Sequence, residues 1–182
     1  MDKSSAPAPD TLVSLISNKD ILQRVEDVAA KLAKIMQNDW VIVALMDGAL
    51  VFAADLMRAL YNHGINPEFE NMTLSSYGDD IQSAGEVKVE KGLTRDVSGR
   101  CVLIVDDVFE TGLTLQTAVQ MMGEAGAGDV KTCVFARKSG YNEDIPLPDF
   151  SAWDAPDAFL VGYGMDFKGR YRGLPFIADL LA

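Results

Sequence analysis

Three carboxylates lie close together in the segment CVLIVDDVFETGLTLQTAV, which covers residues 101–119. Asp106 and Asp107 are adjacent, and Glu110 follows them after two intervening residues. The apolar residues before the aspartates are typical of a buried strand in a parallel sheet. Ligands of such a sheet bind beyond the carboxyl ends of its strands, so we expect these acids to lie at a binding site.

The turn after the acids has the composition of an anion-binding site. Gly112 permits a tight turn, and the helix expected over residues 114–124 would offer unpaired backbone amides at its start. Thr111 and Thr114 add hydroxyl donors. Carboxylates beside an anion site suit a ligand with both a phosphate and a vicinal diol. The simpler interpretation, in which the acids only cap the helix, accounts poorly for three acids, a glycine and two threonines together.

Several other chemistries are excluded by residues that the chain lacks. His63 is the only histidine, so a two-histidine zinc site cannot form, and we expect His63 at the surface or at a helix end. Leu113 follows the glycine of the turn, where a P-loop would have a lysine. Cys101 and Cys133 are the only cysteines and fall in expected strands, which favours reduced thiols and a cytoplasmic location.

The composition indicates one globular domain with an acidic surface. The chain has 182 residues, 48% of them hydrophobic, and a formal net charge of −11. Such a charge argues against a nucleic-acid partner, and no apolar run approaches the roughly 18 residues of a membrane span. A phosphorylated ligand must therefore be held by local amides, cations or a metal ion. Residues 1–14 are expected to form a flexible leader.

Alternating strand and helix patterns predict an α/β fold. Helical spacing of apolar residues occurs before the acidic turn at residues 17–36 and 50–64. Strand patterns cover residues 40–46, 67–76, 86–92, 102–105 and 130–136. This order predicts a mostly parallel twisted sheet flanked by helices. The polar, glycine-containing residues 77–85 are expected to form a mobile loop.

The last part of the chain has a different character. Residues 137–182 are rich in proline, glycine, aromatic and charged residues, and only residues 159–161 have a convincing strand pattern. We expect this part to form an irregular hood lobe that covers one end of the sheet. It shows no boundary of a separate domain, so residues 1–182 are treated as one domain.

Three segments in a fixed order carry a resemblance to a known family. They are VLIVDDVFETGLTL (102–115), LSSYGDDIQSAGEVKVEKGL (74–93) and FLVGYGMDFKGRYRGLPFI (159–177). Together they resemble the type I phosphoribosyltransferases, and more narrowly the hypoxanthine-guanine phosphoribosyltransferase family. The resemblance extends from about residue 15 to the end of the chain. It implies the type I phosphoribosyltransferase fold and a reaction between phosphoribosyl pyrophosphate and a 6-oxopurine base.

The resemblance implies a role for each residue of the acidic turn. Asp106 and Asp107 would hold the ribose hydroxyls of phosphoribosyl pyrophosphate, directly or with Mg²⁺. Glu110 stands where the family has an aspartate that faces purine N7 and handles a proton, and its side chain is one methylene longer. The 5′-phosphate would be bound by the four residues that follow, which are Thr111, Gly112, Leu113 and Thr114.

Three further residues match the family's purine site. Lys138 corresponds to the lysine that contacts the purine 6-oxo group. Because an ammonium group only donates hydrogen bonds, it favours hypoxanthine or guanine over adenine. Phe159 matches the aromatic residue that stacks on the base, and Leu160 matches a position whose backbone meets the purine edge.

The resemblance also implies a pyrophosphate site and a closing loop. Asp166, next to the purine site, matches the acid that ligates a second Mg²⁺ together with pyrophosphate, and Arg172 matches the arginine that reaches pyrophosphate. Ser76 and Tyr77 match a loop pair that closes over the transition state and excludes water.

The pyrophosphate loop is one of two departures from the family pattern, the other being Glu110. Asp47-Gly48 replaces a basic residue followed by glycine, which the family joins through a cis peptide. The backbone amides of Asp47 and Gly48 could still donate to pyrophosphate, but the carboxylate would repel it unless Mg²⁺ lies between them.

The resemblance predicts a purine salvage enzyme that forms IMP or GMP and releases pyrophosphate. It also implies a homodimer or homotetramer. The two departures leave open an alternative from another class, a non-catalytic regulator that binds phosphoribosyl pyrophosphate or nucleotides on the same fold. The other matched residues favour the enzyme.

Overall fold

A six-stranded sheet forms the centre of the protein. The computed structural model describes residues 12–76, 87–138 and 145–181. In sheet order the strands are β4 (Val87–Lys91), β3 (Glu68–Ser76), β2 (Val41–Met46), β5 (Cys101–Phe109), β6 (Asp129–Lys138) and β7 (Phe150–Ala155). Every neighbouring pair is parallel except β3 and β4. This confirms the prediction of an α/β fold with a mostly parallel sheet.

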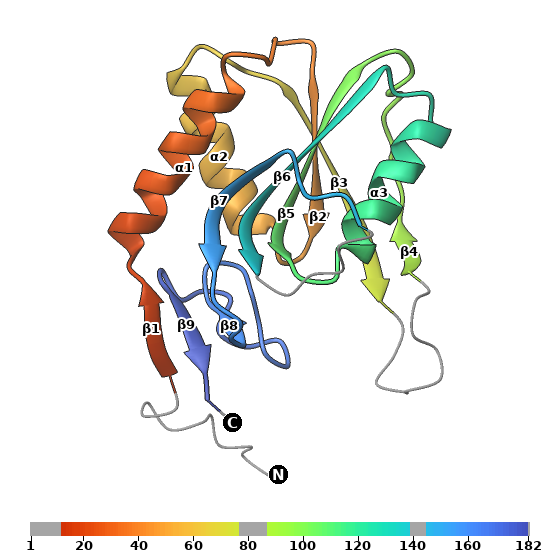
Figure 1. The fold of residues 1–182 in the computed structure, drawn as a ribbon. Helices are drawn as coiled ribbons and strands as arrows, with labels where there is room; N and C mark the ends of the chain where they lie inside the picture. Colours follow the sequence, from red (N-terminus) through yellow and green to blue (C-terminus); the bar gives the residue numbers. More distant parts are fainter. Residues whose placement is uncertain (1–11, 77–86, 139–144, 182) are drawn as a thin grey trace.

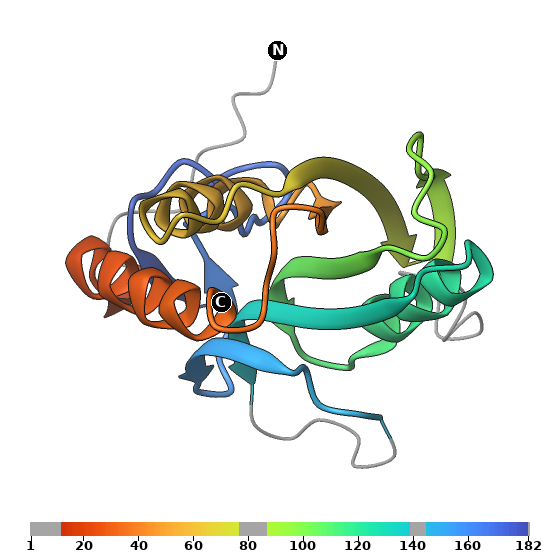
Figure 2. The ribbon, with the colours of Figure 1, turned by 90° about the horizontal axis from the view of Figure 1, so that it is seen from above.

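Helices cover both faces of the sheet. Helices α1 (Asn18–Leu32) and α2 (Leu50–Asn62) lie on one face, and α3 (Leu113–Glu124) lies on the other (Figure 2). The Ser17 side chain caps α1 by accepting a hydrogen bond from the Asp20 amide. His63 is the C-cap residue of α2, as expected for a residue at a helix end. Within the described residues, none of the helices is long and apolar enough to cross a membrane.

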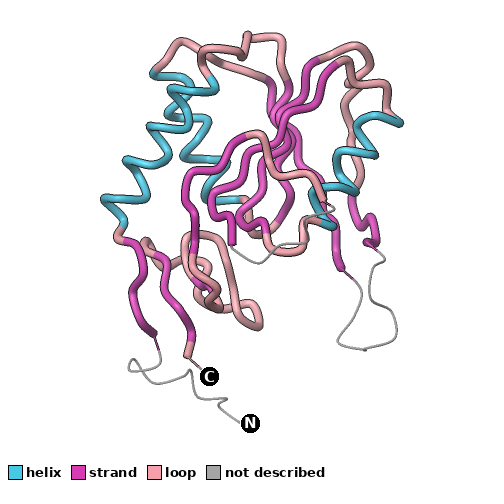
Figure 3. Tube along the Cα trace, in the orientation of Figure 1, coloured by secondary structure: helices cyan, strands magenta, loops and turns pink. Residues whose placement is uncertain are grey.

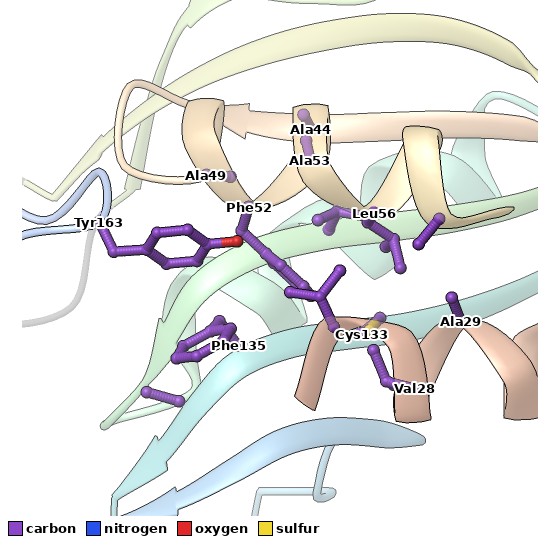
Figure 4. Packing of buried hydrophobic residues seen from close by; sticks show 14 of the residues in the cluster. Val28, Ala29, Ala44, Ala49, Phe52, Ala53, Leu56, Cys133, Phe135 and Tyr163 are labelled. Carbon is purple, nitrogen blue, oxygen red and sulfur yellow. The ribbon is translucent and has the colours of Figure 1, made fainter. Parts of the chain in front are cut away.

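The continuous apolar runs of the strands make two hydrophobic cores, one on each face. The larger core lies between the sheet and helices α1 and α2, and Figure 4 shows Phe52 and Leu56 of α2 within it. The smaller core lies between the sheet and α3. Cys133 is buried and unpaired, and burial raises the pKa of its thiol, so it behaves as a small apolar side chain.

A smaller antiparallel sheet forms the hood. Its strand order is β1 (Leu12–Ile16), β9 (Ile177–Leu180) and β8 (Leu160–Val161). The arrowheads of β2, β5, β6 and β7 point towards the end of the main sheet where β8 and β9 lie (Figure 1). The chain between β8 and β9 is drawn mostly as loop in Figure 3. The hood therefore lies beyond the carboxyl ends of the parallel strands, where a ligand site is expected.

Two expectations about this region were wrong in their boundaries. The flexible leader was expected to reach residue 14, but residues 12–14 belong to β1 and pair with β9. The hood was expected to begin at residue 137 and to hold one strand. Instead, β7 extends the central sheet by pairing with β6, and the hood contains β8, β9 and the distant β1.

Candidate active site

The two aspartates of the acidic turn lie within β5 itself. The strand was expected to end at residue 105, but it continues to Phe109, and Asp106 pairs with Val134 of β6. Each carboxylate accepts a hydrogen bond from the next backbone amide, at 3.0 Å for Asp106 and 2.8 Å for Asp107. The sheet therefore fixes the backbone of the acidic pair.

Burial makes this carboxylate pair electrostatically costly. Asp106 is 8% exposed. Burial, followed by the negative charge of Asp107, raises the pKa of Asp106 well above its ordinary value. Burial also raises the pKa of Asp107, although the Arg172 charge opposes this effect. A pair that is costly to ionise is stabilised by cations or by hydroxyl donors, which is what a ribose–metal site supplies.

The loop after β2 packs directly against this pair. The peptide bond between Met46 and Asp47 is cis. A side chain at Gly48 would overlap with the Asp107 carboxylate, and a side chain at Gly164 of the hood would overlap with the Gly48 carbonyl oxygen. The two glycines thus allow the acidic pair, the loop and the hood to lie in contact.

The turn before α3 also depends on a glycine. Gly112 is in the left-handed region, with φ of 77°, and is the N-cap residue of α3. A Cβ at this position would lie 2.7 Å from Cγ2 of Ile145. The Leu113 amide lies 3.4 Å from the Thr111 hydroxyl. The first-turn amides, including that of Thr114, have no partner within the helix and suit an anion.

One cavity brings together most of the residues expected at the purine site. Its volume is about 230 Å³, and it is lined by Asp107, Val108, Glu110, Lys138, Phe159, Leu160, Met165 and Asp166. Of these, Val108 and Met165 were not expected, because apolar residues beside a motif have no chemical signature of their own. The cavity lies between the acidic turn and the hood, with polar groups from both.

An ion pair within the cavity joins two expected residues. Nζ of Lys138 donates to Oε1 of Glu110 at a distance of 2.9 Å. The Lys138 side chain is 9% exposed and that of Glu110 is 58% exposed. The buried ammonium therefore orients a carboxylate that faces the open part of the site, and the longer side chain of Glu110 is accommodated.

Phe159 offers an aromatic surface at the same cavity. It is 49% exposed, which is unusual for a phenylalanine. Phe167 contacts it edge-on, with ring centroids 5.6 Å apart and an interplanar angle of 89°. The backbone amide of Phe159 donates a hydrogen bond to the Asp179 carboxylate of β9. The ring is thus held by the hood while much of its surface stays available for stacking.

A charged cluster in the hood contains the expected pyrophosphate residues. Nη2 of Arg172 lies 2.9 Å from Asp166 and 3.9 Å from Asp47. Nη1 of Arg172 donates to the Gly164 carbonyl oxygen at 2.7 Å. Asp166 in turn accepts a hydrogen bond from the Gly169 amide at 2.6 Å. The arginine therefore compensates part of the charge of Asp47, the residue that departs from the family pattern.

The expected loop pair is only partly described. Ser76 is the last residue of β3, which ends at the same edge of the sheet as β2 and β5. Tyr77 and the expected mobile loop 77–85 lie outside the described residues. Their role stays a prediction.

The acidic residues fit Mg²⁺ only if a substrate completes its coordination. Among the residues that the structure describes, no group of three or more metal-ligating side chains is close enough to hold an ion by itself. Mg²⁺ commonly binds through one or two carboxylates together with waters and substrate phosphates. Asp107 and Asp166, which line the same cavity, are oxygen donors of that kind.

Comparison with known proteins defines the class of this protein. The family model described as phosphoribosyl transferase domain matches residues 14–168. The chain belongs to this family.

Individual relatives of the chain belong to one group within this family. The chain is 38% identical over 168 residues to the hypoxanthine-guanine phosphoribosyltransferase of Bacillus subtilis, with 91% of each chain covered. It is 30% identical to the protein of the same name in Dictyostelium discoideum, covering 91% of this chain and 93% of the relative. A solved hypoxanthine phosphoribosyltransferase from Staphylococcus aureus matches with a TM-score of 0.87 and 27% identity, covering 98% and 96% of the two chains.

Proposed function

We propose that the protein transfers the phosphoribosyl group of phosphoribosyl pyrophosphate to hypoxanthine or guanine, forming IMP or GMP and pyrophosphate. The Glu110–Lys138 ion pair carries this proposal, because it lies in a cavity that Asp107, Phe159 and Asp166 also line. The names of the relatives support the same reaction. In this cavity the purine base, the sugar donor and the leaving pyrophosphate would each meet a suitable side chain.

Lys138 and Glu110 would act on the purine base. An ammonium group has three donors, so Lys138 can donate to the purine 6-oxo group while it keeps its hydrogen bond to Glu110. The Glu110 carboxylate would accept the proton at N7 as the ring nitrogen attacks the sugar. Phe159 would stack on the base, and the backbone of Leu160 would meet its edge.

The acidic turn would hold the sugar and its phosphate. Asp106 and Asp107 would accept hydrogen bonds from the ribose hydroxyls, and the turn from Thr111 to Thr114 would bind the 5′-phosphate. Carbon C1′ develops positive charge in the transition state, so both partners must be held in line and water kept out. The Ser76–Tyr77 pair is proposed to close over them.

Asp47, Gly48, Asp166 and Arg172 would hold the pyrophosphate group. The amides of the loop and the Arg172 guanidinium supply donors, and Asp107 and Asp166 would ligate Mg²⁺. When bound, Mg²⁺ neutralises charge on the leaving pyrophosphate.

The proposal includes a cytoplasmic location and a homodimer or homotetramer. The two unpaired cysteines support a reducing compartment. Light scattering on purified protein measures the oligomeric state directly.

The test is a spectrophotometric assay with Mg²⁺ and phosphoribosyl pyrophosphate, offering hypoxanthine, guanine, xanthine and adenine separately. We expect turnover of hypoxanthine or guanine, a loss of about 10²–10⁴-fold in kcat for Glu110→Ala, and a milder effect for Glu110→Asp, which restores the family residue. A wild-type protein that binds phosphoribosyl pyrophosphate but turns over no base would leave the regulator as the better account.

A further inference from the structure

The residues assigned to pyrophosphate come from two parts of the fold that must be held in register. Asp47 and Gly48 lie between β2 and α2, whereas Asp166 and Arg172 lie in the loop between β8 and β9. The two parts meet where Gly164 packs against the Gly48 carbonyl oxygen. This contact leaves no room for a Cβ, so the hood and the loop after β2 lie very close together there. A small shift of the hood would move Asp166 and Arg172 away from Asp47 and Gly48.

A partly buried hydrogen bond joins these two parts close to their contact. The hydroxyl group of Tyr163 donates to Oδ2 of Asp55, on α2, at 2.8 Å. Tyr163 is 3% exposed, and its ring centroid lies 4.9 Å from that of Phe135. Figure 4 shows the ring beside Phe52, with its hydroxyl group directed towards α2. Burial, and then the charge of Asp55, raises the pKa of Tyr163, so the hydroxyl group stays protonated and donates.

The backbone around Tyr163 is unusual and leads directly to Arg172. Tyr163 has a φ of 52° and lies between Gly162 at 97° and Gly164 at 104°. A bulky residue rarely adopts such a φ, and it persists only where surrounding contacts hold it. The Gly164 amide donates to the Arg172 carbonyl oxygen at 3.0 Å, and the Arg172 guanidinium donates back to the Gly164 carbonyl oxygen at 2.7 Å.

From these contacts we infer that Asp55 and Tyr163 are positioning residues for the pyrophosphate site. Their hydrogen bond fixes the hood on α2, and it thereby sets the distance from Arg172 and Asp166 to the loop at Gly48. Neither residue lines the cavity or is assigned to the substrate. This inference rests on the proposed function, since it assigns the site to pyrophosphate.

Arg58 provides a matched control on the same helix. It also forms an ion pair with Asp55, but its side chain is 75% exposed. Its charge opposes the rise in the pKa of Tyr163, but Arg58 donates no hydrogen bond in the contact between Tyr163 and Asp55. Arg58→Ala therefore removes a partner of Asp55 without removing the link to the hood.

The experiment compares Tyr163→Phe, Asp55→Ala, their double variant and Arg58→Ala. Tyr163→Phe keeps the ring and removes only the donor. We expect the KM for phosphoribosyl pyrophosphate to rise about tenfold in both single variants, with the KM for hypoxanthine changed less than twofold. Because the two single variants break the same hydrogen bond, the double variant should be little worse than the poorer single variant. Arg58→Ala should resemble wild type.

A melting temperature for each variant separates positioning from packing. If Tyr163→Phe lowers the melting temperature but leaves the KM for phosphoribosyl pyrophosphate unchanged, or raises both KM values equally, the positioning role is wrong. Binding of pyrophosphate with Mg²⁺, measured by calorimetry, tests the inference without turnover. A wild-type protein without activity would overturn the proposed function, while weaker pyrophosphate binding by Tyr163→Phe would still support the positioning role.

Discussion

The acidic turn and the hood differ in what holds their functional residues in place. Asp106 lies in a central strand, with β2 on one side of that strand and β6 on the other. Asp166 and Arg172 lie in a loop, where long-range contacts such as Tyr163–Asp55 set their position. Backbone hydrogen bonds between neighbouring strands persist when a side chain is changed. A loop that is held by a few side-chain contacts shifts when one of those contacts is lost. Changes in the turn should therefore alter chemistry with the fold kept, and changes in the hood should alter both.

Among the substitutions that compare the acidic turn with the hood, the largest effect is expected from Asp106→Asn. The amide keeps the shape but loses the charge that is proposed to hold the ribose and its cation, so kcat/KM should fall by about 10²–10³-fold. The unliganded variant should be more stable than wild type at pH 7, by about 1 kcal/mol or more, because a costly buried charge is removed. Steady-state kinetics and thermal unfolding of the same preparations measure both changes. A variant that loses stability together with activity would contradict this account of the acidic turn.

The stabilisation by Asp106→Asn should depend on pH in a definite direction. The folded protein raises the pKa of Asp106, so it binds the proton more tightly than the unfolded chain does. The contribution of this group to stability is therefore present below its unfolded pKa, about 3.9, and is lost as pH rises through the folded value. The difference in melting temperature between variant and wild type should be largest at neutral pH and shrink towards pH 4.

The same contrast explains which parts of the structure could be predicted from sequence. The run at residues 40–46 and the acidic turn carry local signals, namely continuous apolar residues and a glycine after clustered acids. Strand β1 was missed because Leu12–Ile16 acquires its structure by pairing with Ile177–Leu180 at the other end of the chain. β7 was missed because its sequence, FSAWDA, has no alternation of apolar and polar residues and forms a strand by pairing with β6.

The residues of the candidate site also divide into those that have a local sequence signal and those that do not. Glu110, Lys138, Phe159 and Asp166 were each expected at the site from the family resemblance, but the ion pair between Glu110 and Lys138 was not. The Asp55–Tyr163 hydrogen bond was not expected, because its two residues are far apart in sequence and the resemblance assigned a role to neither of them. A tyrosine between two glycines was the only local signal, and it indicates an unusual backbone rather than a partner.

Two glycine substitutions give the next largest effect and compare the two regions directly. Gly164→Ala would meet the Gly48 backbone at a φ of 104°, so we expect it to cost about 2–4 kcal/mol of stability and to weaken binding of phosphoribosyl pyrophosphate strongly. For Gly112→Ala, at a φ of 77°, the nearest atoms belong to the side chains of Ile145 and Phe109, which can move, so about 1–2 kcal/mol is expected. Urea unfolding and calorimetry measure the two quantities.

Gly173→Ala is the control for this comparison. A Cβ there meets no atom within 4 Å, so the hood should accept it with wild-type stability and binding. Equal losses at positions 164 and 112 would show that the hood is no more sensitive to backbone overlap than the turn.

The smallest effect is expected from Asp47→Asn, at the point where the two regions meet. The Asp47 side chain is 73% exposed and lies 3.9 Å from Arg172, so its charge is only partly compensated and is screened by solvent. Removing that charge should tighten pyrophosphate binding by about threefold at low ionic strength, and less at 0.5 M salt. Asp39→Asn, at the opposite end of β2, removes the same charge away from the site and should change nothing. Tighter binding that persists unchanged at high salt would point to rearrangement of the loop, and weaker binding would mean that the Asp47 carboxylate helps to hold pyrophosphate through a cation.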